Sequence, residues 1–188
     1  MARAEPLYFG AEDRPLFGWL HRAPGAAPLG VVLCNPFGYE AICTHRVLRH
    51  FAEAAAAAGV PALRFDYDGT GDSAGDDRDP QRLDAWIGSV GAAIDALRAH
   101  AGVDRVVLLG VRLGALLAAL AAHRRGDVDG LVAIAPVIKG KAHLRELRAL
   151  QMSTPAGAAL REDDGVQAAL GFALTAATRA ALAEVDLT

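Results

Sequence analysis

The residues with the clearest chemical consequence are Gly110-Val111-Arg112-Leu113-Gly114, which follow an apolar run at residues 105–109 and precede an apolar helical run. The pattern G-x-S-x-G at a sharp strand-to-helix turn presents a serine nucleophile, and its small flanking residues make room for the strained backbone. Here both glycines are present and Arg112 stands where the serine would be. A guanidinium stays protonated at physiological pH and has no lone pair with which to attack a carbonyl. Nucleophilic catalysis through this position is therefore excluded.

Two interpretations of Arg112 remain open at the level of sequence. At the first turn of a helix, free backbone N–H groups and the helix dipole favour an anion, and a guanidinium adds a bidentate donor, so one interpretation is an anion pocket. The other is a structural arginine that fills an inactive site and pairs with Asp66 or Asp68. A buried, unpaired guanidinium would cost on the order of several kcal/mol. We therefore expect an acidic group, from the chain or from a ligand, to meet Arg112.

A glycine-rich segment at residues 66–75 formally matches a dinucleotide-binding pattern, Gly-x-Gly-x-x-Ala. Its context argues against that function, because residues 75–80 continue as a polar loop instead of opening a helix. We expect a structural turn in which Asp68 and Asp72 bond the backbone and the glycines adopt positive φ. Ser73 belongs to this turn in our interpretation. No cofactor is predicted.

Cysteine and histidine side chains give neither a metal site nor a substitute nucleophile. Cys34 and Cys43 lack metal-ligand spacing, and nothing near Cys34 lowers its pKa, so we interpret it as a small core residue. His45 could approach a pocket from the start of a helix, whereas His143 lies in a later, charged segment. Three other histidines fall on expected helix surfaces: His50, His100 and His123. None has a partner at a spacing that would make it a catalytic base.

Composition indicates one globular domain with a sizeable core, since the 188 residues are 53% hydrophobic. The formal charge is -3, with 19 basic and 22 acidic residues interspersed, which gives no basic face for nucleic acid or an anionic membrane. The first ten residues lack a signal sequence, and the apolar stretches are too short to span a bilayer. We expect a cytoplasmic protein with reduced thiols.

Apolar strands alternate with amphipathic helices along most of the chain. The expected strands are 7–10 and 16–21, paired as a hairpin, then 30–35, 61–67, 105–109 and 130–135, and the expected helices are 44–58, 81–100 and 113–124. Near-continuous Val, Leu and Ile in the later strands predicts a three-layer α/β fold with a mostly parallel sheet and helices on both faces.

The composition changes after Pro136, where a charged helix at residues 139–151 leads into an alanine-rich stretch. We expect two parts, a core at residues 1–138 and a helical cap or lid at residues 139–188. No further strand rich in Val or Ile follows before Thr188, so the last strand of the sheet would keep an open edge. We expect a second chain, self-association or further sequence to cover that edge.

With these elements in order, the chain resembles the α/β-hydrolase superfamily, in particular serine aminopeptidase-like hydrolases, and most closely the exosortase A system-associated hydrolases. The resemblance is carried by Cys34-Asn35-Pro36-Phe37-Gly38 with His45-Arg46 after it, by Arg64-Phe65-Asp66-Tyr67-Asp68-Gly69-Thr70-Gly71-Asp72-Ser73, and by Gly110-Val111-Arg112-Leu113-Gly114-Ala115. It implies a hydrolase of ester, acyl or peptide bonds. The chain departs from the pattern at the serine, and it ends before the strands that carry the acid and histidine of the triad.

The resemblance also implies where ligand would bind. Phe37, Val111 and Leu113 are candidates for oxyanion-loop residues, although residues 35–38 alone could equally be a proline-glycine turn that exits a strand. Predicted ligand contacts are Asn35, Phe37, Gly38, Arg112 and Leu113, for a small acyl, ester or anionic ligand. Three hypotheses follow: a hydrolase that is weak or inactive alone, a non-catalytic binding protein, and one half of a split or truncated hydrolase.

Overall fold

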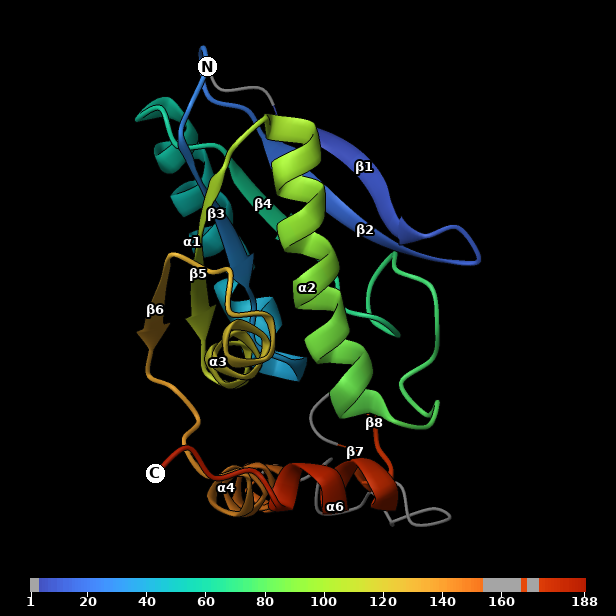
Figure 1. The fold of residues 1–188 in the computed structure, drawn as a ribbon. Coiled ribbons are helices and arrows are strands. Elements are labelled where there is room, and N and C mark those ends of the chain that lie inside the picture. Colours follow the sequence, from blue (N-terminus) through green and yellow to red (C-terminus); the bar gives the residue numbers. More distant parts are fainter. Residues whose placement is uncertain (1–3, 154–166, 169–172) are drawn as a thin grey trace.

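A six-stranded sheet in the order β1-β2-β4-β3-β5-β6 forms the centre of the protein (Figure 1). The structure is a computed structural model and describes residues 4–153, 167–168 and 173–188. The strands of this sheet are β1 (Ala4–Ala11), β2 (Arg14–His21), β3 (Leu29–Cys34), β4 (Ala62–Phe65), β5 (Arg105–Val111) and β6 (Gly130–Ile134). The longer helices are α1 (Gly38–Ala57), α2 (Arg82–Ala101), α3 (Leu113–Arg125) and α4 (Gly140–Met152).

The pairing of the strands confirms the predicted hairpin and the mostly parallel sheet. β1 pairs antiparallel with β2, and β2 pairs antiparallel with β4. The pairs β3–β4, β3–β5 and β5–β6 are all parallel. Because the parallel strands all run the same way, the loops after β3, β4 and β5 meet at one edge of the sheet, where a site can form.

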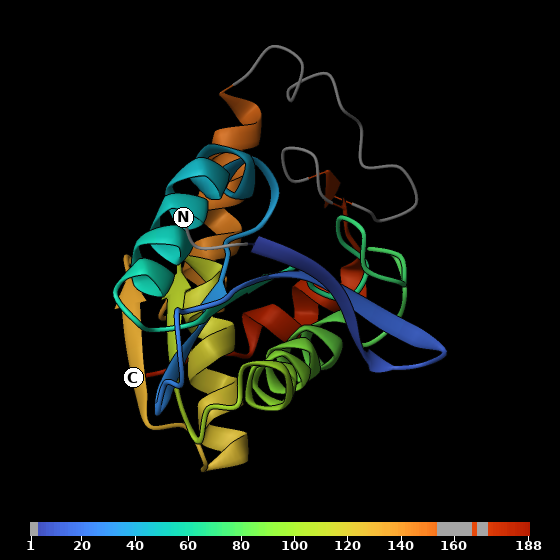
Figure 2. The same cartoon turned by 90° about the horizontal axis from the view of Figure 1, so that it is seen from above.

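Helices cover both faces of the sheet, as Figure 2 shows, with α1 on one side and α2 and α3 on the other. Alternation along the strands divides the core accordingly. Leu33 and Leu109 belong to the cluster under α1, whereas Val32 and Leu108 belong to the larger cluster under α2 and α3. Each buried strand therefore contributes apolar side chains to both faces, which explains its near-continuous hydrophobic sequence.

Element boundaries differ from the predicted ones mainly at α1, which begins at Gly38 and not at residue 44. Phe37 caps this helix in an extended conformation. The turn expected after β3 is thus only three residues long, Asn35 to Phe37, and leads directly into the helix. β5 also runs two residues further than expected, to Val111, so that the strand continues into the elbow.

α4 and α6 (Ala176–Ala183) lie side by side beyond the ends of the parallel strands in Figure 1. Short strands β7 (Gln167–Ala168) and β8 (Ala173–Leu174) pair antiparallel. Leu174 and Leu182 are buried in the same cluster as core residues such as Trp86. The cap segment thus shares the apolar interior of the core, and the division at residues 138/139 stays a prediction.

β6 is the outer strand of the sheet and has no partner on its far side among the described strands. Leu131, Val132 and Ile134 are each more than 40% exposed. An edge strand with exposed β-branched and aliphatic side chains offers unpaired backbone groups together with an apolar surface. This is the open edge that the sequence predicts.

Candidate functional site

The elbow at Arg112 has the backbone of a nucleophile turn. Arg112 lies between β5 and α3 with φ 54° and ψ −121°, a conformation that costs a non-glycine residue roughly 1–3 kcal/mol. Its N–H donates to the carbonyl of Ile134 at 3.0 Å. A Cβ on Gly110 would collide with the backbone of Ala115, and one on Gly114 would collide with the carbonyl of Cys34. Both glycines are therefore required by close packing of the turn.

Two carboxylates hold the Arg112 side chain. Its Nε donates to Oε1 of Glu40 at 2.8 Å, and its NH2 group lies 2.6 Å from Oε2 of Glu146. Glu40 comes from the first turn of α1 and Glu146 from α4. The expectation that Asp66 or Asp68 would be the partner is wrong, because Asp68 is engaged by Arg14 and Arg82 instead. The arginine thus links the core to the cap segment.

The electrostatics of this cluster are dominated by the contacts between Arg112 and its two carboxylates. Hydrogen bonding to Glu146 is the main cause that raises the pKa of Arg112, and the same contact is the main cause that lowers the pKa of Glu146. The Arg112 side chain is 23% exposed, so water screens the pairs only in part. Two negative charges already surround the one positive charge at the elbow.

His143 is the histidine that the structure brings next to the elbow, a position that no local sequence pattern indicates. It lies on α4, is buried, and sits three residues before Glu146, with Nδ1 3.9 Å from Oε2 of that carboxylate. Burial lowers the pKa of His143, which therefore stays neutral at pH 7. His143, Leu113, Phe37 and Glu40 line a hollow of about 20 Å³, room for about one water.

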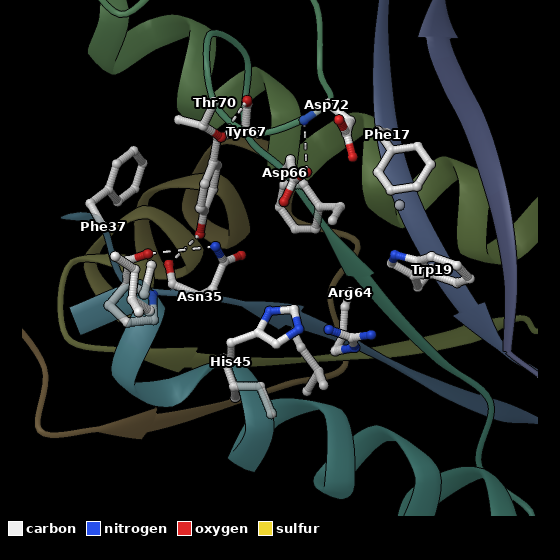
Figure 3. Close-up of a pocket in the computed structure, with 18 of the residues that line it drawn as sticks. Phe17, Trp19, Asn35, Phe37, His45, Arg64, Asp66, Tyr67, Thr70 and Asp72 are labelled. Atoms are coloured by element: carbon white, nitrogen blue, oxygen red, sulfur yellow. Dashed lines mark hydrogen bonds between the residues drawn. The ribbon is translucent and has the colours of Figure 1, made fainter. Parts of the chain in front are cut away.

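The loop after β3 lies against the elbow, as the resemblance implies, and its aromatic side chain is fixed by stacking. The Phe37 ring stacks on Tyr67 with centroids 4.7 Å apart and tilts against Trp86 at 4.6 Å. The Tyr67 hydroxyl donates to the carbonyl of Asn35 at 3.1 Å (Figure 3). The roles of Phe37, Val111 and Leu113 as oxyanion-loop residues stay a prediction.

A cavity of about 720 Å³ opens on the other side of this loop, between α1 and the ends of β2 and β4. That volume is within the range of small-molecule sites. Of the predicted ligand contacts, Asn35, Phe37 and Gly38 line this cavity, whereas Arg112 and Leu113 do not. The predicted ligand residues are therefore divided between the elbow and the cavity by the loop at residues 35–38.

Polar and aromatic side chains that no sequence motif assigns to a site converge on the cavity. Figure 3 shows Arg64, Asp66 and His45 around its interior, with Phe17 and Trp19 along one wall. Arg64 and Asp66 are two residues apart on β4 and just beyond its end, and period-2 alternation puts them on the face opposite to Phe65. This alternation is the sequence signal that could have placed Arg64 and Asp66 together at one site. His45, which the sequence alone assigns to no site, also lines this cavity.

The turn after β4 is structural, as predicted, but the carboxylate that bonds its backbone is not that of Asp68. Gly69 and Gly71 adopt φ values of 73° and 54°. Ser73 donates its hydroxyl to the carbonyl of Asp66 at 2.6 Å and accepts from the N–H of Phe17 at 2.9 Å. The carboxylate that bonds the turn backbone is that of Asp66, which accepts from the N–H of Asp72 at 3.1 Å. The Asp68 carboxylate instead pairs with arginines, so the expectation for Asp68 is wrong.

The remaining candidates have the environments expected of them. Cys34 is fully buried, and burial raises the pKa of its thiol to about 12, so it is no nucleophile. The histidines expected on helix surfaces, His50, His100 and His123, are all exposed. Within residues 4–153, 167–168 and 173–188, no cluster of three or more His, Cys, Asp or Glu side chains could hold a metal ion. In the same ranges, no helix has the length and apolar character needed to cross a membrane.

Fold and elbow together define an α/β-hydrolase-like protein with a modified nucleophile position. The family model of serine aminopeptidases, S33, matches residues 31–163, which is more than half of the chain. The chain therefore belongs to this family. No curated protein matches the chain at a significant level.

Solved structures support the fold. A lidless α/β serine hydrolase from Xanthomonas campestris is 24% identical with a TM-score of 0.60, over 72% of this chain and 62% of that one. An esterase from Pyrococcus furiosus is 21% identical with a TM-score of 0.63, over 79% and 56%. A hypothetical protein from Pseudomonas aeruginosa is 16% identical with a TM-score of 0.69, over 98% and 72%. The chain spans less than two thirds of the length of the first two.

Proposed function

We propose that this chain is an α/β-hydrolase-fold protein of the exosortase A system-associated type that does not hydrolyse ester, acyl or peptide bonds on its own. One observation carries the proposal: Arg112 occupies the backbone position of the nucleophile, and two carboxylates hold its side chain. The three sequence motifs that resemble exosortase-associated hydrolases support the assignment to that group.

Hydrolysis through a covalent intermediate needs a nucleophile, a base, an orienting acid and an oxyanion hole. Among the described residues, the elbow offers only candidates for the last of these, Phe37, Val111 and Leu113. Oxyanion binding without a nucleophile gives an acceleration of about 10³ to 10⁴ at most. Any turnover by the chain alone is therefore expected to be near background.

The ion pairs favour a structural role for Arg112 over an anion pocket. An incoming anion would have to displace Glu40 or Glu146 from a guanidinium whose charge they already balance. In this view the two ion pairs of the arginine stabilise the packing of α4 against the start of α1. The anion-pocket hypothesis makes the opposite prediction, namely saturable anion binding that is lost in Arg112→Ala.

The test compares wild type, Arg112→Ser and Arg112→Ala with a fluorophosphonate probe and a panel of p-nitrophenyl esters. We expect background ester turnover and no labelling for wild type and Arg112→Ala. Arg148→Ala is the matched control, because Arg148 is an exposed arginine on α4, away from the elbow position. Labelling of Arg112→Ser alone would fit the proposal and would locate the defect in the nucleophile. Wild-type turnover that survives in Arg112→Ala would show another nucleophile and contradict it.

A second candidate function is favoured by the exposed edge of β6. In this hypothesis the chain supplies part of a hydrolase, and further strands that carry the acid and the histidine pair with β6. Leu131, Val132 and Ile134 would become buried in that assembly. The chain covers only 56–62% of the serine hydrolase and esterase structures described above, which supports an incomplete sheet.

Sedimentation velocity tests this second candidate. We expect wild type to self-associate through the uncovered edge, and the double variant Val132→Lys/Ile134→Lys to sediment as a monomer, because charges on an edge strand oppose pairing. A wild-type protein that stays monomeric at high concentration and unfolds cooperatively would count against the hypothesis.

A further inference from the structure

Two charged side chains without partners of opposite charge face the large cavity. The Arg64 side chain has one hydrogen bond, from its Nε to Nε2 of His21 at 3.2 Å, and no carboxylate of the described residues lies within 4.0 Å of it. The Asp66 carboxylate accepts from a backbone N–H, and no cationic group of the described residues lies within 4.0 Å of it. Both side chains line the cavity and are half-buried.

Each of these groups carries a cost of burial that no ion pair within the described part of the chain offsets. Burial is the main cause that lowers the pKa of Arg64, and it is also the main cause that raises the pKa of Asp66. The two groups attract each other only at a distance. Half-buried charges are stabilised when hydrogen-bonding partners of opposite charge reach them. The cavity is where such a partner would have to lie.

Aromatic rings form the wall beside these two groups. Trp19 is the direct cross-strand neighbour of Arg64 in the β2–β4 register. The Trp19 ring meets that of Phe17 edge-on at 5.8 Å, and Phe17 contacts Tyr8 at 5.2 Å. Trp19 is 37% exposed and Tyr8 62% exposed. An exposed row of rings next to two charged groups that have no ion pair among the described residues is typical of a small-molecule site.

We propose that this cavity binds a small molecule in which a carboxylate is close to a hydrogen-bond donor, a hydroxyl or an ammonium group, on an apolar or aromatic body. The carboxylate binds Arg64, the donor binds Asp66, and the body packs against Trp19 and Phe17. Other charged or titratable groups line the same cavity: His45, Arg46, Asp72 and Asp77. Arg112 does not line it, so this inference goes beyond the proposed function and is tested independently of hydrolysis.

Four related compounds separate the two contacts. L-Phenylalanine carries a carboxylate and an ammonium, and 3-phenyllactate carries a carboxylate and a hydroxyl. 3-Phenylpropionate lacks the donor, and 2-phenylethylamine lacks the carboxylate. We expect saturable binding of the first or the second, at least about tenfold tighter than binding of the last two, since a ligand that leaves a buried polar group unpaired loses about 1.4 kcal/mol or more.

Nuclear magnetic resonance of the tryptophan indole N–H groups provides the readout, because the chain has two tryptophans and only one lines the cavity. The signal of Trp19 is expected to shift on titration, whereas that of Trp86, which is fully buried, stays as an internal reference. The variant Trp19→Phe assigns the signals. Arg64→Gln and Asp66→Asn are each expected to weaken binding at least about tenfold, and Arg148→Gln, a change of an exposed arginine on α4, is expected to leave it unchanged.

Folding of each variant is checked by its thermal unfolding curve, and Arg64→Lys provides a second variant that keeps the charge but loses the planar fork. Several results would overturn the proposal. They are the absence of saturable shifts with all four compounds, equal binding of the compounds that lack one group, or binding that survives both Arg64→Gln and Asp66→Asn.

Discussion

Two arginines at the same edge of the sheet show opposite solutions to the problem of placing a charge there. Arg112 at the elbow meets Glu40 and Glu146, whereas Arg64 at the cavity meets, among the described residues, a histidine nitrogen and no carboxylate within 4.0 Å. A structural arginine needs carboxylate partners from the chain. Among the described residues Arg64 has none, and this leaves a place for the carboxylate of a ligand. The elbow has the clearest sequence motif, yet its arginine is already paired with carboxylates of the protein, unlike the arginine of the cavity.

The largest expected effect comes from an arginine buried further than either. Arg82 is 2% exposed at its side chain and pairs with Asp68, which Arg14 also contacts. Removal of one partner from a buried pair is strongly destabilising, so we expect Arg82→Ala to lower the free energy of unfolding by about 3 kcal/mol. Urea denaturation measures this. Arg124→Ala, which breaks an exposed pair, is the control and should cost less than about 1 kcal/mol.

Arg112→Ala is expected to have an intermediate effect. It removes two partly exposed ion pairs, which should lower the free energy of unfolding by about 1–2 kcal/mol. Arg112→Gly also removes them but tolerates the positive φ, so we expect it to be more stable than Arg112→Ala by about 1 kcal/mol. The same denaturation experiment compares the two. Equal stability of the alanine and glycine variants would contradict a strained elbow.

The ion pair between Arg112 and Glu146 at the elbow should also weaken in acid. The pKa of Glu146 is lowered by Arg112, so its contribution to stability is complete above its ordinary pKa near 4.5 and is lost as the pH falls through the lowered value. Thermal unfolding from pH 7 to pH 3 should show wild type more stable than Glu146→Gln at pH 7, with the difference closing below about pH 4.5. Burial lowers the pKa of His143 in both proteins, and only wild type has the opposing effect of Glu146, which raises the pKa of His143. Glu12→Gln, in the β1–β2 turn, should show no such convergence.

The smallest expected effect concerns Arg64. Because burial disfavours its charge and no carboxylate of the described residues forms an ion pair with it, Arg64→Met should change the free energy of unfolding by less than about 1 kcal/mol. Denaturation alongside Arg82→Met, a paired arginine with the same replacement, provides the contrast. A loss of about 3 kcal/mol in Arg64→Met would indicate a structural role for Arg64 and would remove the expected difference between Arg64 and Arg82.

Short sequence patterns predict those parts of the fold that depend on residues near one another in the sequence. The hairpin, the parallel strands and the elbow glycines follow from alternation, apolar runs and turn residues, and the structure has all of them. α1 was placed six residues late, because Asn35-Pro36-Phe37-Gly38 has the composition of a turn and only its packing under Tyr67 and Trp86 shows that the helix begins at once.

The partners of Arg112 could not be predicted, since they come from positions 72 residues before it and 34 residues after it in the sequence. Asp66 and Asp68 were more obvious candidates because they follow a neighbouring strand. Asp66 directly follows β4 and lines the cavity, whereas Asp68 lies in the turn beyond it and pairs with Arg82. Which carboxylate meets which arginine is a property of the assembled layers, and no local spacing encodes it.

The two cysteines give the protein a natural position for chemical labelling. Cys34 is sealed in the core with a thiol pKa near 12, so it will not react with a maleimide in the folded state. Cys43 is exposed on α1, between Ile42 and His45, which both line the cavity. A fluorophore or spin label can therefore be attached to the unaltered chain at one site, at the mouth of the cavity, and can report its occupancy without any engineered residue.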